Sequence, residues 1–179
     1  MAGTELLDVV DIMDRPIGKA NVKDCLEKGL LHRAVATIVI RSGGELLLQR
    51  RSVKDLWHPG RWTLSSTGHV RSGETYPRAA RRELLEELRI RSSVRQLTKF
   101  LLPKVRSRGL TEWEHVALFV CHTDQRALVD PVELEEVREL SAEEVRGMLS
   151  GRRLTPDARI VLSVYFRLAG NDPRPSGAF

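Results

Sequence analysis

Three glutamates in the middle of the chain have a spacing that could hold a metal ion. Glu83, Glu86 and Glu87 are three and four positions apart, so at about 100° per residue their carboxylates fall on one arc of a helix. Leu84 and Leu88 lie on the opposite arc, where they can be buried. Repulsion between the carboxylates makes the acidic face unfavourable unless a cation lies beside it. That cation is either a divalent metal ion or a neighbouring arginine, as on an ordinary solvated helix face.

The same stretch carries a longer pattern of glycine, glutamate and arginine. Its fixed positions are Gly68, Glu74, Arg82, Glu83, Glu86 and Glu87. If each of these residues occurs at a frequency of about one in ten, all six would match by chance at about one in a million starting positions. The stretch therefore resembles the Nudix box, and the resemblance extends over residues 5–168.

The Nudix resemblance implies a fold, a cofactor and a set of roles. The fold would be α+β, with a mixed β-sheet core flanked by helices in an α/β/α sandwich. The cofactor would be Mg²⁺ or Mn²⁺, held by carboxylates against a diphosphate. Glu83, Glu86 and Glu87 become metal ligands, and either Glu83 or Glu87 becomes the general base. Arg82 would hold the glutamate side chains, and Glu74 would brace the loop that begins at Gly68.

One position departs from the Nudix pattern. Arg89 stands where the family has a glycine at the end of the helix, a position suited to a left-handed backbone. A non-glycine residue in that conformation costs about 1–2 kcal/mol. We therefore expect the helix end to differ locally, while the carboxylates that precede it are kept.

More of the chain resembles one branch of the superfamily, the type I isopentenyl-diphosphate isomerases and their hydrolase-like relatives. The matching segments are "LLHRAV", "LLLQRR", "WHPGRWTLSSTGHV" and "TEWEHVALF". The resemblance implies a metal site made of His32, His69, Glu112 and Glu114. The last two are two positions apart on an expected strand and so point to one face. A further histidine of that site falls on Cys25, which we interpret as a small buried residue and not as a ligand.

Two positions distinguish an isomerase from a hydrolase. Isomerisation moves protons on a carbon skeleton, and the family uses a cysteine where this chain has Thr67. A tryptophan of the isomerase site falls on Asp157. Both differences favour a hydrolase that cleaves a nucleoside diphosphate derivative or another X-linked diphosphate. The alternatives are an isopentenyl-diphosphate isomerase and a catalytically weak binding module, which the intact glutamates disfavour.

Basic and aromatic residues supply the remaining candidates for substrate contact. Arg50, Arg51 and Lys54 are expected near the phosphates. Trp57 and Trp62 could stack on the group attached to the diphosphate, although two tryptophans in an irregular loop more often serve as packing anchors.

The elements that position these residues follow from periodicity and turn signals. A hairpin of apolar strands is expected at residues 32–41 and 45–51, followed by an irregular loop at 52–67 and a helix at 75–88. Two further strands at 93–105 and 111–123 flank the turn "RSRG", and an edge strand is expected at 132–140. Ser141 with Glu144 predicts a capped helix, and Thr155 followed by proline opens a last helix through residue 168.

Length and composition indicate one domain, residues 1–170, with a β-rich extension at about 1–30 and a disordered tail at 171–179. The chain has 179 residues, 41% apolar and 30% charged. It has no apolar run long enough to span a bilayer and no signal-peptide pattern, which predicts a cytoplasmic protein with both cysteines reduced. The net charge of +5 suits an anionic small molecule. The basic residues occur in pairs that are not interleaved with aromatic residues, which disfavours nucleic-acid binding. The sequence leaves open whether the protein forms a homodimer.

Overall fold

A mixed β-sheet forms the centre of the computed structural model, which describes residues 5–53, 58–128 and 134–170. Its strands run in the order β11-β4-β3-β10-β7, with β5 paired to β4 and β6 paired to β3. The strands β3 and β10 are parallel, and every other pair in this sheet is antiparallel. The strands are β3 (His32–Ile40), β4 (Leu46–Arg51), β5 (Trp62–Thr63), β6 (Ser66–His69), β7 (Arg95–Leu101), β10 (Glu114–His122) and β11 (Leu134–Leu140).

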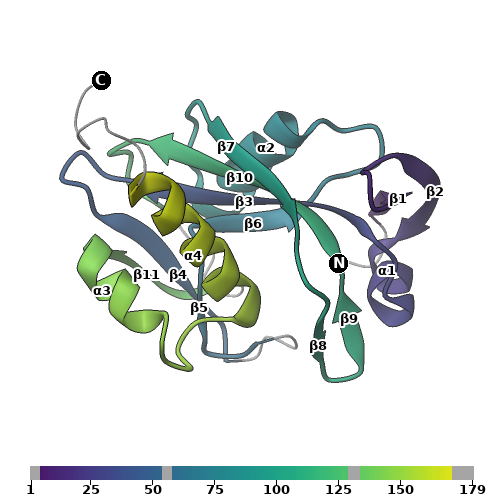
Figure 1. Ribbon diagram of the computed structural model, residues 1–179. Helices are drawn as coiled ribbons and strands as arrows, with labels where there is room; N and C mark the ends of the chain where they lie inside the picture. Colours follow the sequence, from purple (N-terminus) through teal and green to yellow (C-terminus); the bar gives the residue numbers. More distant parts are fainter. Residues whose placement is uncertain (1–4, 54–57, 129–133, 171–179) are drawn as a thin grey trace.

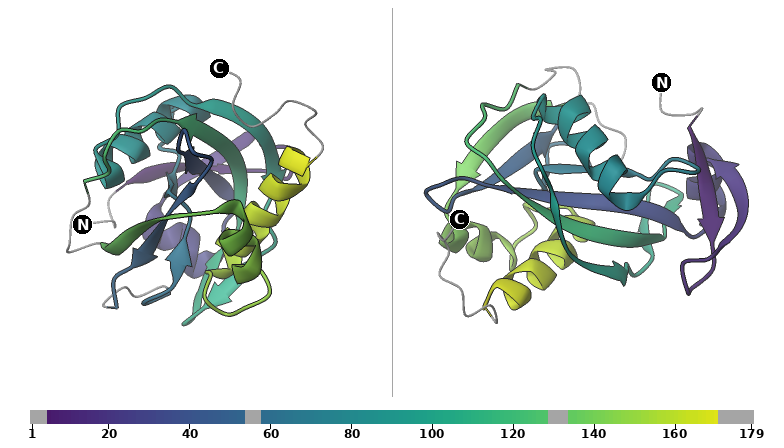
Figure 2. Two further views of the ribbon diagram at one scale, coloured as in Figure 1. Left: turned by 90° about the vertical axis from the view of Figure 1, so that its left-hand side faces the viewer. Right: turned by 90° about the horizontal axis from the view of Figure 1, so that it is seen from above.

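Helices cover both faces of this sheet, as the two views of Figure 2 show. Helix α2 (Tyr76–Leu88) packs Ala80, Leu84 and Leu88 against one face. Helices α3 (Ala142–Met148) and α4 (Pro156–Gly170) pack against the other face over a larger apolar cluster. The expected α/β/α sandwich and the α+β class are confirmed.

A small N-terminal unit stands beside one end of the sheet (Figure 1). It consists of the antiparallel pair β1 (Leu6–Val10) and β2 (Pro16–Asn21), followed by α1 (Val22–Lys28). Asn21 caps α1 through its side chain, and Gly29 ends the helix with φ +61°. Cys25 is fully buried in the apolar cluster between these elements, where burial raises the pKa of its thiol to about 11.

Several expected segments are divided differently in the structure. The stretch predicted as an irregular loop at 52–67 contains β5 and the first two residues of β6, because their backbones pair with β4 and β3. The strand expected at 93–105 is two strands, β7 and β8 (Val105–Ser107), and β8 forms a separate hairpin with β9 (Leu110–Glu112). The expected edge strand is β11, which starts within the described residues at Leu134.

Local helix signals are confirmed. Ser141 and Glu144 form the predicted capping box of α3. Helix α4 starts at Pro156 as predicted and ends two residues later than expected. Within the described residues, no helix is long and apolar enough to cross a membrane. Residues 171–179, predicted to be disordered, lie outside the described part of the chain.

Candidate functional site

Arg82 is the centre of the polar network on α2. Its Nε and Nη2 donate to the two carboxylate oxygens of Glu74 at 3.1 and 2.9 Å. Its Nη1 donates to Glu83 at 2.5 Å and to Glu86 at 3.2 Å, and Nη2 also donates to the carbonyl of His69 at 2.9 Å. One guanidinium therefore fixes two glutamates of the helix relative to the loop that precedes it.

Glu83 is buried and Glu87 is half-buried, so neither lies on a fully solvated face of the helix. Burial raises the pKa of Glu83 to about 7, against the opposing effect of Arg82. Burial, together with the charge of Glu83, raises the pKa of Glu87 to about 8. The Thr67 N–H and Gln49 Nε2 donate to the same oxygen of Glu87, at 3.2 and 3.4 Å. The two carboxyl groups are thus held in fixed positions where their charge is poorly solvated.

The packing around Glu83 explains why residue 68 is glycine. A Cβ atom on Gly68 would lie 2.1 Å from Oε1 and Cδ of Glu83, closer than atoms can approach. Strand β6 therefore passes directly against the Glu83 carboxylate, and any side chain at position 68 would displace that carboxylate.

A second cluster forms where β3, β6 and β10 meet. Glu114 is paired with His32 in the parallel β3–β10 register, and Ala34 is paired with His69 across β3 and β6. The Oε1 atom of Glu114 lies 3.3 Å from His32 Nε2 and 3.5 Å from His69 Nε2. Ligand atoms of the three residues all lie within 4.8 Å of one another.

The chemistry of this cluster fits a divalent cation. His32 Nδ1 donates to the carbonyl of Leu30 at 2.8 Å, so in the neutral ring Nε2 carries a lone pair. That buried Nε2 has no hydrogen-bond partner although it faces the Glu114 carboxylate. Burial opposes ionisation of Glu114, but an Nε2 proton on His32 or His69 holds the pKa of Glu114 below its usual range, and a divalent cation would take the place of such a proton. Two imidazole nitrogens and a carboxylate form a set of metal ligands that suits Mn²⁺ or Zn²⁺ better than Mg²⁺.

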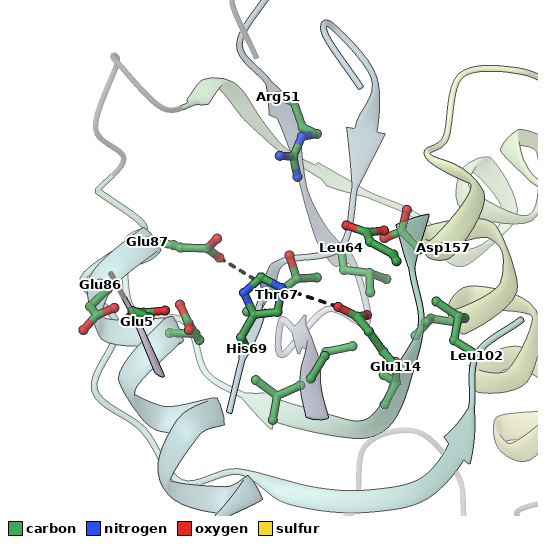
Figure 3. A pocket seen from close by; sticks show the side chains of 18 of the residues that line it. Glu5, Arg51, Leu64, Thr67, His69, Glu86, Glu87, Leu102, Glu114 and Asp157 are labelled. Atoms are coloured by element: carbon green, nitrogen blue, oxygen red, sulfur yellow. Dashed lines mark hydrogen bonds and ion pairs between the residues drawn. The ribbon is translucent and has the colours of Figure 1, made fainter. Parts of the chain in front are cut away.

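One cavity of about 620 Å³ joins the two clusters (Figure 3). The acidic residues of α2 stand at one end, and Thr67, His69 and Glu114 lie in the middle. Arg51 enters from β4. The far end is formed by apolar residues and by Asp157, at the start of α4, whose pKa is raised by burial. The size is within the usual range for small-molecule sites.

Comparison with models of protein families shows to which family this chain belongs. A model of the NUDIX domain matches residues 30–162. The chain belongs to the NUDIX family. The match confirms the expected family, and relatives named as isopentenyl-diphosphate isomerases confirm the expected branch.

The similar Nudix proteins are named for different reactions. Isopentenyl-diphosphate Delta-isomerase 2 of Photorhabdus laumondii is 31% identical over 163 residues, which are 91% of this chain and 89% of that protein. An uncharacterized Nudix hydrolase of Pseudomonas aeruginosa is 34% identical over 166 residues, 90% of this chain and 93% of that one. A Deinococcus radiodurans crystal structure matches with a TM-score of 0.73 and 26% identity, covering 90% of this chain and 99% of the other.

Three residues expected in the Nudix site do not take the positions expected of them. Arg50 does not line the cavity, because its guanidinium pairs with Glu136 at 2.7 Å and Glu135 at 3.3 Å on β11. Glu112 lines the cavity but is not part of the three-residue cluster of His32, His69 and Glu114. Trp62 lies in β5, near the guanidinium of Arg50, and does not line the cavity. Lys54 and Trp57 lie outside the described residues.

One cavity residue had no signal in the sequence. Glu5 precedes β1, yet it lines the Nudix cavity and pairs with Arg71, whose guanidinium also lies 3.5 Å from Glu86. The bridge between Leu7 and Arg71 brings this segment to the site. No motif marks Glu5, because its position depends on packing between distant segments.

Proposed function

We propose that this protein is a metal-dependent Nudix hydrolase that cleaves the diphosphate linkage of a nucleoside diphosphate derivative or a similar X-linked diphosphate. The observation that supports it most is the cavity that Glu83, Glu86 and Glu87 line together with His69 and Glu114. His32 is fully buried and reaches this site through Glu114, 3.3 Å from its Nε2. Carboxylate and imidazole side chains that can bind metal ions surround this cavity. Such a site suits a small phosphorylated molecule held through divalent ions. We place the protein in the cytoplasm, as a single domain over residues 1–170.

The proposed roles follow from how each side chain is held. Glu83, Glu86 and Glu87 would hold Mg²⁺ or Mn²⁺, and the histidine cluster, with Glu112 beside it, would hold a second ion. Bound ions supply Lewis-acid polarisation of phosphoryl oxygens and lower the pKa of a water molecule. Glu87 is placed as the general base, since two donors fix one of its oxygens, with Glu83 as the alternative.

Residues around the carboxylates would orient the reactants. Arg82 keeps Glu83 and Glu86 in place, and Glu74 holds Arg82 in turn. Arg51 enters the cavity and would bind phosphate oxygens as a planar bidentate donor. Arg50 is a weaker candidate for this role because it is paired with acids on β11.

A second candidate function is isopentenyl-diphosphate isomerisation. The His32, His69 and Glu114 cluster and the 31% identical relative named for that activity favour it. Two cavity residues speak against it. Thr67 has a hydroxyl that is a poor proton donor or acceptor for carbon, and Asp157 places a carboxyl where the isomerase pattern has a tryptophan. A binding module without catalysis would need neither cluster.

The deciding experiment follows the isoprenoid isomer ratio together with the release of cleavage products, which are phosphate or pyrophosphate from terminal di- and triphosphates and two phosphomonoesters from dinucleotides and nucleotide sugars. Purified protein is incubated with Mg²⁺ or Mn²⁺ and nucleoside di- and triphosphates, dinucleotides, nucleotide sugars or isopentenyl diphosphate. Release should fall by about 10²–10⁴-fold in Glu87→Gln, the range for loss of a general base. It should persist in Glu143→Gln, which alters an exposed glutamate of α3. Formation of dimethylallyl diphosphate without phosphate release would favour the isomerase instead.

A further inference from the structure

The cavity has two chemically different ends (Figure 3). At one end lie Glu5, Glu86 and Glu87. The other end is formed by side chains from the large apolar cluster beneath α4: Ala34, Ala36, Leu64, Leu102, Val116 and Val161. A diphosphate bound at the polar end would therefore direct its organic group toward an apolar wall.

Asp157 interrupts this apolar wall. It is the second residue of α4 and lines the cavity together with Val161, which lies four residues later on the same face of the helix. Hydrogen bonding to Thr155 and the charge of His58 favour its ionised form, burial and the charge of Glu114 oppose it, and its pKa is raised overall. An ionised carboxylate offers about four acceptor positions, and the protonated form keeps its carbonyl oxygen as an acceptor. Acceptor capacity therefore remains, and it faces the cavity.

We infer that Asp157 selects a diphosphate whose organic group is compact and largely apolar but carries a hydroxyl or amino hydrogen-bond donor. This inference rests on the proposed function and narrows its substrate class. A hydrocarbon group would displace water from the Asp157 carboxyl without replacing its hydrogen bonds, which is strongly unfavourable. Sites built to accept a hydrogen bond reject analogues that lack the donor far more strongly than apolar pockets reject an extra methylene.

The test uses a pair of ligands that differ by one hydroxyl. The methylene-bridged, non-hydrolysable analogues of 3-methylbutyl diphosphate and 4-hydroxy-3-methylbutyl diphosphate are titrated calorimetrically into the protein with Mg²⁺. The native protein should bind the hydroxylated ligand at least tenfold more tightly. Asp157→Leu should remove or invert this ratio, and Asp157→Asn should keep part of it, because the amide oxygen still accepts a hydrogen bond. Glu143→Leu, on the exposed part of α3, should leave the ratio unchanged.

The outcomes separate this inference from the proposed function. No preference in the native protein, or a preference that survives Asp157→Leu, overturns the role of Asp157. If Asp157→Leu does not fold, as judged by circular dichroism, Asp157→Asn decides: a ratio below that of the native protein supports the role of Asp157, and the full native ratio overturns it. Because the ligands cannot be hydrolysed, absence of any cleavage product from the substrate panel would count against the hydrolase and not against the selectivity of binding.

Discussion

At the scale of single residues, Glu83 and Glu87 are carboxyl groups held away from bulk water. Their pKa values, raised to about 7 and 8 mainly by burial, mean that without a metal ion both gain protons on folding near neutral pH. A divalent ion reverses this preference, because it binds the ionised forms. The same burial that disfavours these charges in the metal-free protein therefore strengthens their interaction with a cation.

We predict that the metal-free protein becomes less stable as pH rises from about 5 to 8. A folded-state pKa above the unfolded value means that the folded protein binds more protons, so the free energy of unfolding falls with rising pH. One pKa unit corresponds to about 1.4 kcal/mol, and the total should reach a few kcal/mol. Thermal unfolding in EDTA at several pH values measures this slope. Glu87→Gln should flatten it, and an equal or steeper slope would contradict the assignment.

His69 offers the cleanest test of the second metal position. Its ring is partly accessible, whereas His32 is fully buried and its replacement would disturb the core. We predict that His69→Ala weakens Mn²⁺ binding at least tenfold, because one of three donors is lost. Mn²⁺ titration followed by electron paramagnetic resonance measures the affinity. His122→Ala, at the exposed end of β10, should bind Mn²⁺ as the native protein does, and equal affinities for both variants would exclude His69 as a ligand.

At the scale of elements, the end of α2 shows how the fold tolerates an unusual residue. Arg89 adopts the left-handed conformation, φ 58° and ψ 22°, that its family fulfils with glycine. Its N–H bonds to the carbonyl of Leu85, and the Ile90 N–H bonds to Leu84, both at 3.2 Å. The expected local difference is therefore absent, because these hydrogen bonds and the burial of Ile90 hold the strained backbone.

Arg89→Gly should raise the free energy of unfolding by about 0.5–1 kcal/mol. Relief of the left-handed strain exceeds the greater freedom that glycine gives the unfolded chain. Chemical denaturation would detect the gain. The matched variant Arg91→Gly removes an arginine from a position without positive φ and should be slightly less stable than the native protein. A loss of stability in Arg89→Gly would show that the side chain contributes more than the backbone strain costs.

At the scale of the whole molecule, Asp14 attaches the N-terminal unit to the sheet. Its carboxylate accepts from Arg33 Nε at 2.6 Å and Tyr76 Oη at 3.1 Å, and it also pairs with Lys99. Burial opposes ionisation, but Lys99 and Arg33 hold the pKa of Asp14 below its usual range. The link matters for the site because the same unit places Glu5 at the cavity.

Asp14→Asn should lower the free energy of unfolding by about 1–2 kcal/mol. Asparagine tolerates the positive φ of 64° found here, so the loss reports the charge and not the backbone. Urea denaturation gives the difference, and amide hydrogen exchange should become faster in β1 and β2. Glu27→Gln, which breaks a long surface pair with Lys23, should change stability by less than about 0.5 kcal/mol. Equal effects of the two variants would mean that Asp14 is not a structural link.

Features that depend on local geometry could be predicted from the sequence alone. The helix α2, its carboxylates and the capping box of α3 follow from spacings of three and four residues, which a helix converts directly into shared faces. Resemblance to a family was needed to associate His32, His69 and Glu114, because they belong to three strands whose register is set by distant parts of the chain.

Only the tertiary structure decided which neighbours each candidate meets. Arg50 and Arg51 are adjacent in the sequence, but alternation along β4 and the pairing with β11 direct Arg50 to glutamates outside the cavity and leave Arg51 to line it. Glu5 and Asp157 come from opposite ends of the chain and share one cavity. Such contacts have no periodic signature, because they arise when separate elements pack against the same sheet.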